Sequence, residues 1–74
     1  MKNVIVWSKV NCSYCEKAKA LLRSKGVVFE ERKLGEVWTT DDLLAVVPTA
    51  KTVPQIFIDN KLIGGYTELV KFVG

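Results

Sequence analysis

Residues 4–15 decide how this chain folds, and they read Val4-Ile5-Val6-Trp7-Ser8-Lys9-Val10-Asn11-Cys12-Ser13-Tyr14-Cys15. The stretch begins with a continuous apolar run, which is typical of a strand that is covered on both faces. It ends with the only two cysteines of the chain, and a helical pattern follows them. The cysteine pair is therefore predicted at the junction where a strand passes into a helix.

The spacing of the cysteines indicates redox chemistry. Cys12 and Cys15 are separated by two residues. Two thiols with this spacing can close a disulfide within one helical turn and open it again. A structural zinc site needs about four ligands, but the chain has no histidine and no further cysteine. The sequence thus argues against an intrachain metal site, and no metal ligands are predicted.

Cys12 is the predicted nucleophile of the pair. The thiolate is the reactive form, and the free N–H groups and positive dipole end of the following helix would stabilise it. Lys9 adds a positive charge upstream, so we expect the pKa of the Cys12 thiol to be lowered. Cys15 lies inside the first helical turn, should be less exposed, and is the natural resolving thiol.

The composition describes one small domain, which we assign to residues 1–74. Apolar residues make up 49% of the chain, enough to fill a core. The net charge of +3 indicates either ordinary solvated surface or a modest attraction for anionic partners. Because the lysines are scattered, no nucleic-acid surface is predicted. Without an export signal or an apolar run near the roughly 20 residues of a membrane span, we expect a cytoplasmic protein with no membrane contact.

Three helices are predicted from apolar spacing and capping patterns. The first covers residues 13–25, with a Ser13–Glu16 capping box, Gly26 past its end, and lysines such as Lys19 largely off the apolar face. The second opens at a Thr39–Asp42 capping pattern and is stopped by Pro48, and the third covers residues 66–73.

Strands are predicted between these helices. One begins at Val27 and becomes polar through Lys33, which is typical of a sheet edge. Residues 55–58 and 61–63 form a hairpin around an Asp59-Asn60 turn. The order β-α-β-α-β-β-α, with right-handed crossovers, predicts an α/β fold. Its four-stranded mixed sheet flanked by three helices resembles the thioredoxin-like fold.

Two further motifs allow two interpretations each. In Thr52-Val53-Pro54, the proline is either an ordinary residue at the entry of an edge strand or a cis proline. A cis bond would leave the Val53 backbone free to pair with an extended peptide. The Gly64-Gly65 pair either just separates a strand from a helix or lets helix N-terminal amides receive a carboxylate.

Taken together, these segments resemble the glutaredoxin family. The matching stretches are Lys9 with Cys12-Ser13-Tyr14-Cys15, Ser24-Lys25-Gly26-Val27, Thr52-Val53-Pro54-Gln55-Ile56-Phe57-Ile58, and Ile63-Gly64-Gly65-Tyr66-Thr67-Glu68. They cover nearly the whole chain in the family's order. The resemblance implies a thioredoxin fold, a cis Pro54, and glutathione as reductant and co-substrate that is not tightly bound.

The resemblance also implies a set of glutathione contacts. Cys12 would attack the sulfur of a glutathione mixed disulfide, and the Val53 backbone would pair with the cysteine of glutathione. Lys9, supplemented by Lys51, would approach the glycine carboxylate. The implied contact residues are Lys9, Tyr14, Thr52, Val53, Pro54, Gly65, Tyr66, Thr67 and Glu68. Thr67 and Glu68 would hold the γ-glutamyl end, with Glu68 one methylene longer than the usual aspartate.

The expected function is reduction of glutathione mixed disulfides and protein disulfides, in electron transport and cell redox homeostasis. Expected partners are glutathione and disulfide-containing or glutathionylated proteins, with ribonucleotide reductase as one candidate, and the protein is expected to be a monomer. Ser13 replaces the family's usual proline. This keeps open a [2Fe–2S] cluster carrier, in which Cys12 of two subunits and two glutathiones hold the cluster. The other alternative is a redoxin that is reduced by thioredoxin reductase rather than by glutathione.

Overall fold

The protein is a four-stranded mixed sheet with helices on both faces, and its computed structural model describes residues 3–74. The elements are β1 (Val4–Ser8), α1 (Ser13–Ser24), β2 (Glu30–Lys33), α2 (Thr40–Val46), β3 (Gln55–Ile58), β4 (Lys61–Gly64) and α3 (Tyr66–Val73). The strand order is β2-β1-β3-β4, with β1 parallel to β2 and the other pairs antiparallel. The predicted element order and the thioredoxin-like fold are confirmed.

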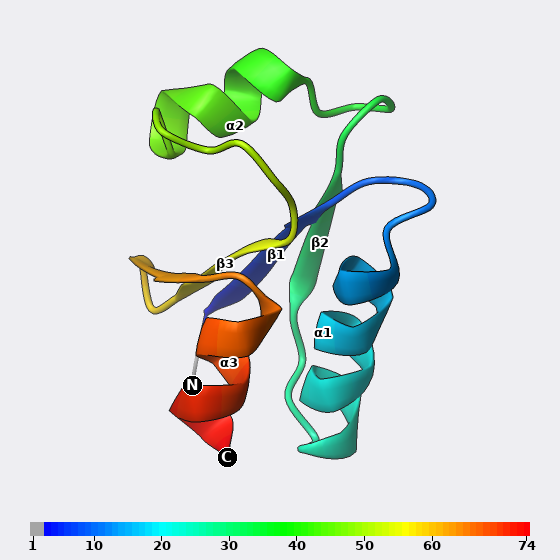
Figure 1. Ribbon diagram of the computed structural model, residues 1–74, viewed down its shortest axis with the longest axis vertical. Coiled ribbons are helices and arrows are strands. Elements are labelled where there is room, and N and C mark those ends of the chain that lie inside the picture. The colour runs from blue at the N-terminus through cyan, green and yellow to red at the C-terminus, as the bar shows by residue number, and fades with distance from the viewer. Residues whose placement is uncertain (1–2) are drawn as a thin grey trace.

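The central strand β1 supplies side chains to both faces of the sheet. Val4 and Val6 pack with residues of α1 and α3, whereas Trp7 packs with Leu43 and Val47 at α2. Figure 1 shows the same division, with α1 and α3 side by side and α2 at the opposite end of the molecule. Because β1 is paired on both edges and covered on both faces, its sequence is apolar, as expected.

The helix α1 begins at Ser13, the first residue of the predicted helix. Ser13 is therefore not the N-cap, and the predicted Ser13–Glu16 capping box is wrong. Its N-cap is Cys12, which has extended backbone angles and accepts the Cys15 N–H at its sulfur. The sulfur thus takes the place of a capping oxygen. At the other end, Gly26 has a φ of +70° and its N–H bonds to Arg23 O, which confirms the predicted stop.

The strand β2 begins at Glu30, not at Val27 as the apolar residues predicted. The Val27 N–H is bonded to Leu22 O, so this residue still belongs to the helix end. Val28 is 89% exposed, and the pairing with β1 starts only at Ile5 and Glu30. The polar strand lies at the edge of the sheet, as predicted.

The predictions for the two ends of α2 and for the β3–β4 turn are confirmed. At α2, Asp42 N–H donates to Thr39 Oγ1 over 3.1 Å and Thr39 N–H donates to Asp42 Oδ2 over 2.8 Å. The helix ends at Val46, shortly before Pro48. In the β3–β4 turn, Asp59 and Asn60 have φ values of 51° and 68°, as a tight hairpin requires.

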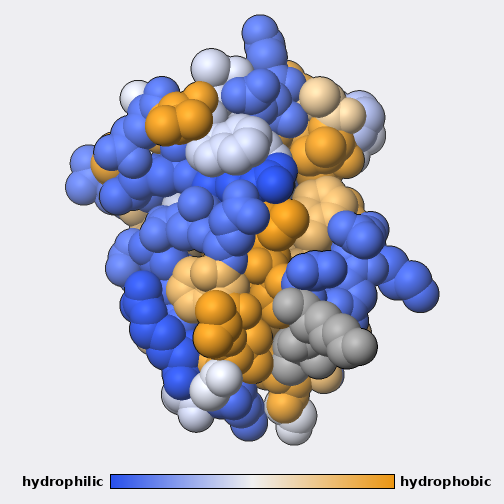
Figure 2. Space-filling model, turned by 180° about the vertical axis from the view of Figure 1, so that it is seen from behind, coloured by the Kyte–Doolittle hydropathy of each residue, from blue (hydrophilic) through white to orange (hydrophobic). Residues whose placement is uncertain are grey.

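The sheet face that carries α2 is only partly covered. Figure 2 shows this side, with apolar side chains at the surface below α2. A shallow hollow of about 230 Å³ lies there, lined by Ile5, Trp7, Arg32, Val46, Phe57 and Asn60. Among the described helices, none is both long enough and apolar enough to cross a membrane.

Candidate active site

The two cysteines form a disulfide at the start of α1. Their Cα atoms are 5.2 Å apart, and the bond joins the β1–α1 loop to the first helical turn. Cys15 is fully buried, whereas Cys12 is half-buried and lines an open hollow with Asn11, Ser13 and Glu16. Cys12 is therefore the sulfur that an incoming thiol or disulfide can reach.

The surroundings of Cys12 favour negative charge on its sulfur. The Cys15 N–H lies 3.1 Å from Cys12 Sγ, and the other amides of the first turn point the same way. After reduction of the disulfide, these donors and the helix dipole would stabilise a thiolate. The local geometry thus agrees with the expected role of Cys12 as the nucleophile.

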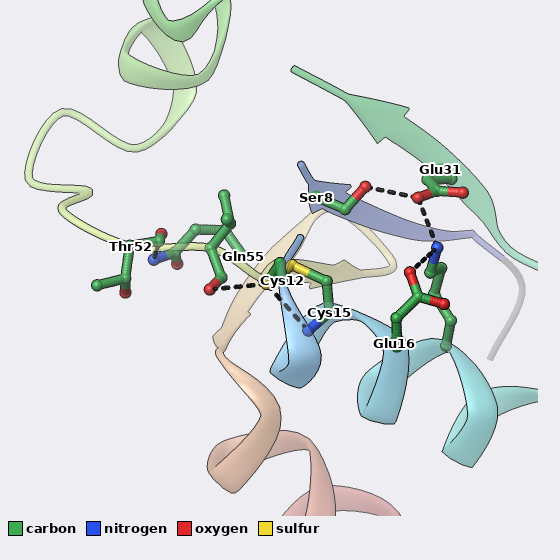
Figure 3. The surroundings of a disulfide bond; sticks show 9 residues. Ser8, Cys12, Cys15, Glu16, Glu31, Thr52 and Gln55 are labelled. Carbon is green, nitrogen blue, oxygen red and sulfur yellow. Dashed lines mark hydrogen bonds and ion pairs between the residues drawn. A yellow bond between two sulfur atoms is a disulfide. The ribbon is translucent and has the colours of Figure 1, made fainter. Parts of the chain in front are cut away.

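The segment before β3 lies directly beside the disulfide. The Val53–Pro54 peptide is cis, as the resemblance implies, and Pro54 is buried. Val53 O lies 3.6 Å from Cys12 Sγ (Figure 3). Among the described residues, no hydrogen bond joins the Val53 N–H to another group. The backbone of this residue can therefore pair with an extended ligand next to the sulfur.

A cavity of about 200 Å³ opens beside this segment. Lys9, Lys51, Thr52 and Val53 line it, so it brings together three of the predicted glutathione contacts and the supplementary lysine. Leu34, Thr40, Leu43, Leu44 and Ala50 form the rest of its wall. Two ammonium groups around a small cavity suit an anionic ligand.

Two tyrosines lie close together at the starts of α1 and α3. The rings of Tyr14 and Tyr66 are 6.0 Å apart, and Lys17 Nζ lies 4.9 Å from the centre of the Tyr14 ring. Tyr14 is exposed and Tyr66 is half-buried. The structure thus places these two predicted contacts next to each other, and adds Lys17, which the sequence did not single out.

The residues at the start of α3 have a structural role besides any ligand contact. Glu68 Oε1 accepts the Gly65 N–H over 2.8 Å, so this carboxylate caps α3. A Cβ atom on Gly65 would lie 3.4 Å from Pro54 O, which shows how closely the β4–α3 junction approaches the cis-proline segment. Thr67 is exposed on the first turn of α3. Sequence reasoning did not anticipate the bond between Glu68 and Gly65, although their spacing is that of a capping box.

A partly buried ion pair behind the disulfide was also missed. Lys19 was predicted to lie away from the apolar face, but only 5% of it is exposed. Its Nζ lies 2.8 Å from carboxylate oxygens of both Glu16 and Glu31. Glu31 also accepts the Ser8 hydroxyl over 2.6 Å (Figure 3). The spacing of Glu16 and Lys19 was the one available signal, because residues three apart are neighbours on a helix.

The pKa values of this pair keep both groups charged. Burial alone would lower the pKa of Lys19, but hydrogen bonds and attraction from Glu16 and Glu31 outweigh it and raise the pKa. For Glu31, burial would raise the pKa, yet hydrogen bonds from Lys19 and Ser8 and nearby positive charge lower it. In residues 3–74, no cluster of three histidine, cysteine or acidic side chains is arranged to hold a metal ion.

Comparison with known proteins identifies the family. The family model described as Glutaredoxin matches residues 4–63, which include the disulfide, the cis proline and all four strands except the end of β4. The chain belongs to the glutaredoxin family.

Individual glutaredoxins are similar in sequence and in structure. Glutaredoxin 3 of Escherichia coli K12 is 44% identical over 69 residues, covering 93% of this chain and 83% of that protein. The crystal structure of Glutaredoxin 1 from Francisella tularensis complexed with cacodylate has a TM-score of 0.81 at 29% identity, covering 93% of this chain and 88% of that one. A buckwheat glutaredoxin–glutathione complex has a TM-score of 0.79 at 30% identity, over 92% of this chain and 64% of that one. Family membership and the cysteine pair together make this glutaredoxin a thiol–disulfide oxidoreductase.

Proposed function

We propose that this chain is a glutathione-dependent thiol–disulfide oxidoreductase in which Cys12 is the nucleophile and Cys15 the resolving thiol. The observation that carries the proposal is the position of Cys12 Sγ, between the first amides of α1 and Val53 O at 3.6 Å. A sulfur in this position is activated on one side and borders a free peptide edge on the other. The similar buckwheat protein, whose structure contains glutathione, supports the choice of ligand.

The first step is attack on a glutathione mixed disulfide. The Cys12 thiolate forms a bond to the glutathione sulfur, the target's S–S bond breaks, and the target protein leaves as a thiolate that takes up a proton. Cys12 is then joined to glutathione. A second glutathione thiolate attacks that sulfur, so that glutathione disulfide leaves and the Cys12 thiolate is restored.

The second cysteine, Cys15, acts in the reduction of protein disulfides. Cys12 first forms a mixed disulfide with one sulfur of the target, and Cys15 then attacks Cys12 and releases the target as a dithiol. This leaves the Cys12–Cys15 disulfide, the form observed here. Two glutathione molecules reduce it again and leave as glutathione disulfide.

The glutathione contacts are proposed along two sides of Cys12. Lys9, Lys51 and Thr52 line the cavity beside Val53 and would receive the glycine carboxylate, while the Val53 backbone pairs with the cysteine of glutathione. Tyr14 and Tyr66 would flank the tripeptide on the other side. The γ-glutamyl end would then reach the start of α3, where the proposed contacts are Gly65, Thr67 and Glu68.

The test is glutathione-coupled reduction of a small mixed disulfide by the wild type, Cys12→Ser and Cys15→Ser. Activity is expected in the wild type and in Cys15→Ser, because release by glutathione needs only Cys12. Cys12→Ser should be inactive. Lys61→Met, on the remote β3–β4 hairpin, is the control for a substitution away from the cysteine pair and should retain wild-type activity.

A parallel assay supplies electrons from NADPH and thioredoxin reductase instead of glutathione reductase and glutathione. Activity only in this second assay would overturn the proposed role of glutathione while leaving the thiol–disulfide chemistry intact. Equal loss in both cysteine variants would instead contradict the division of roles between Cys12 and Cys15.

A further inference from the structure

A charged network lies directly behind the cysteine pair. Lys19 is buried on the same face of α1 as Cys15 and follows it by one helical turn, which places side chains about 5–6 Å apart at Cβ. Ser8 ends β1 at the loop that carries Cys12, and Glu16 lines the same hollow as Cys12. Figure 3 shows this network on the turn next to the disulfide, linked by dashed lines.

Stability alone is a weak reason for such a network. Two charges must lose their water, and replacing a buried ion pair with apolar side chains is often neutral or stabilising. The pair Lys19–Glu31 nevertheless joins α1 to β2 over 2.8 Å, and Ser8 joins β1 to the same carboxylate. The elements α1, β1 and β2 are therefore joined behind the cysteine pair by an ion pair and a hydrogen bond to its carboxylate.

We propose that Lys19 and Glu31 are positioning residues for the cysteine pair, which fix the first turn of α1 and set the stability of its reduced form. Reduction turns one disulfide into two sulfurs, of which Cys12 carries negative charge. The ammonium of Lys19 favours that charge, and the carboxylate of Glu31 opposes it. Charges in a poorly solvated environment act more strongly than they would in water.

The two residues therefore have opposite effects on the redox equilibrium. In Lys19→Met the carboxylates of Glu16 and Glu31 remain without their ammonium, so the reduced form becomes less stable. In Glu31→Gln the ammonium keeps only the exposed Glu16 as a partner, so the reduced form becomes more stable. A purely structural role would shift both variants in the same direction, because each removes the same ion pair.

The experiment measures the equilibrium between the protein disulfide and dithiothreitol at pH 7. The two thiols of dithiothreitol close into a cyclic disulfide and give up two electrons and two protons. The protein disulfide takes both electrons and one proton, which leaves the Cys12 thiolate and the Cys15 thiol, and the second proton passes to the buffer. This equilibrium rests on the cysteine pair alone and needs no glutathione. Failure of the glutathione-coupled assay would therefore leave this test valid.

The equilibrium constant for reduction is expected to fall about three- to tenfold in Lys19→Met and to rise by a similar factor in Glu31→Gln. The double variant should return close to the wild-type constant, since both charges are gone. Lys25→Met is the matched control: it removes the same charge at the far end of α1 and should leave the constant unchanged. Thermal unfolding of each oxidised variant reports whether the fold is retained.

Shifts of the same sign in the two single variants, or no shift in either, would overturn the proposal. If Lys19→Met does not fold, Glu31→Gln and Lys19→Arg decide the question. The first should still raise the constant, and the second, which keeps the charge, should stay near the wild type. A lowered or unchanged constant in Glu31→Gln would then refute the role of the pair.

Discussion

At the scale of single residues, Glu31 links the active-site end of the sheet to α1. Its carboxylate accepts hydrogen bonds from Lys19 and Ser8, both of which are buried. Because these partners lower its pKa from the ordinary value of 4.5, Glu31 holds its proton less readily in the folded protein than in the unfolded chain. The contribution of Glu31 to stability is therefore present above pH 4.5 and is lost as the pH falls through the folded value.

This gives a prediction for acid unfolding. Glu31→Gln should be less stable than the wild type at pH 7, and its free energy of unfolding should fall less steeply between about pH 5 and pH 3. Urea unfolding of the oxidised proteins across that range measures the difference. Glu36→Gln, which removes an exposed carboxylate, is the control. Parallel curves for wild type and Glu31→Gln would contradict the assigned cause.

At the scale of elements, local capping and turn residues decide where the helices and hairpin begin and end. The Thr39–Asp42 capping box, Gly26 after α1 and the Asp59-Asn60 turn were all predictable, because each interaction lies within a few residues along the chain. The N-cap of α1 and the start of β2 were not predicted correctly. Both depend on neighbours that a sequence pattern does not show: a sulfur acting as the N-cap, and the register of β2 on β1.

The cap of α2 should have a measurable effect by itself. Thr39→Ala removes the acceptor of the Asp42 N–H and should lower the free energy of unfolding by about 1 kcal/mol. Thr40→Ala, one residue on and without a capping bond, should change it by less than about 0.5 kcal/mol. Urea unfolding measures both. An equal effect of the two substitutions would show that the side-chain cap is not what starts α2.

At the scale of the whole molecule, two apolar clusters on opposite faces of one sheet hold the fold. The larger cluster joins β1 and β3 to α1 and α3, and the smaller one joins Trp7 to Leu43 and Val47. A chain of 74 residues is expected to have a net stability of only about 4–11 kcal/mol. Each large residue in the main cluster therefore supplies a substantial part of it.

Substitution of Leu69 tests how much the main apolar cluster contributes to stability. It is the buried residue of α3 in the main cluster, and Leu69→Ala should cost about 2–5 kcal/mol. Phe72→Ala, on the same helix but 54% exposed, should cost much less. The measurement is urea unfolding of the oxidised proteins. Comparable losses would mean that α3 contributes through its exposed face as well as through the core.

The candidate glutathione contacts came from the resemblance to glutaredoxins. The sequence by itself determined the order of the elements and the cysteine pair at a strand–helix junction. These follow from apolar periodicity, capping and turn residues, and motif spacing, all of which act over short distances along the chain. Only the tertiary structure decided that Val53 O lies next to Cys12 Sγ, 41 residues away, and that Lys19 is buried between two carboxylates. The physical reason is that burial and electrostatics depend on which elements pack together, and neighbours in space are set by the sheet register and the crossovers rather than by adjacency in sequence.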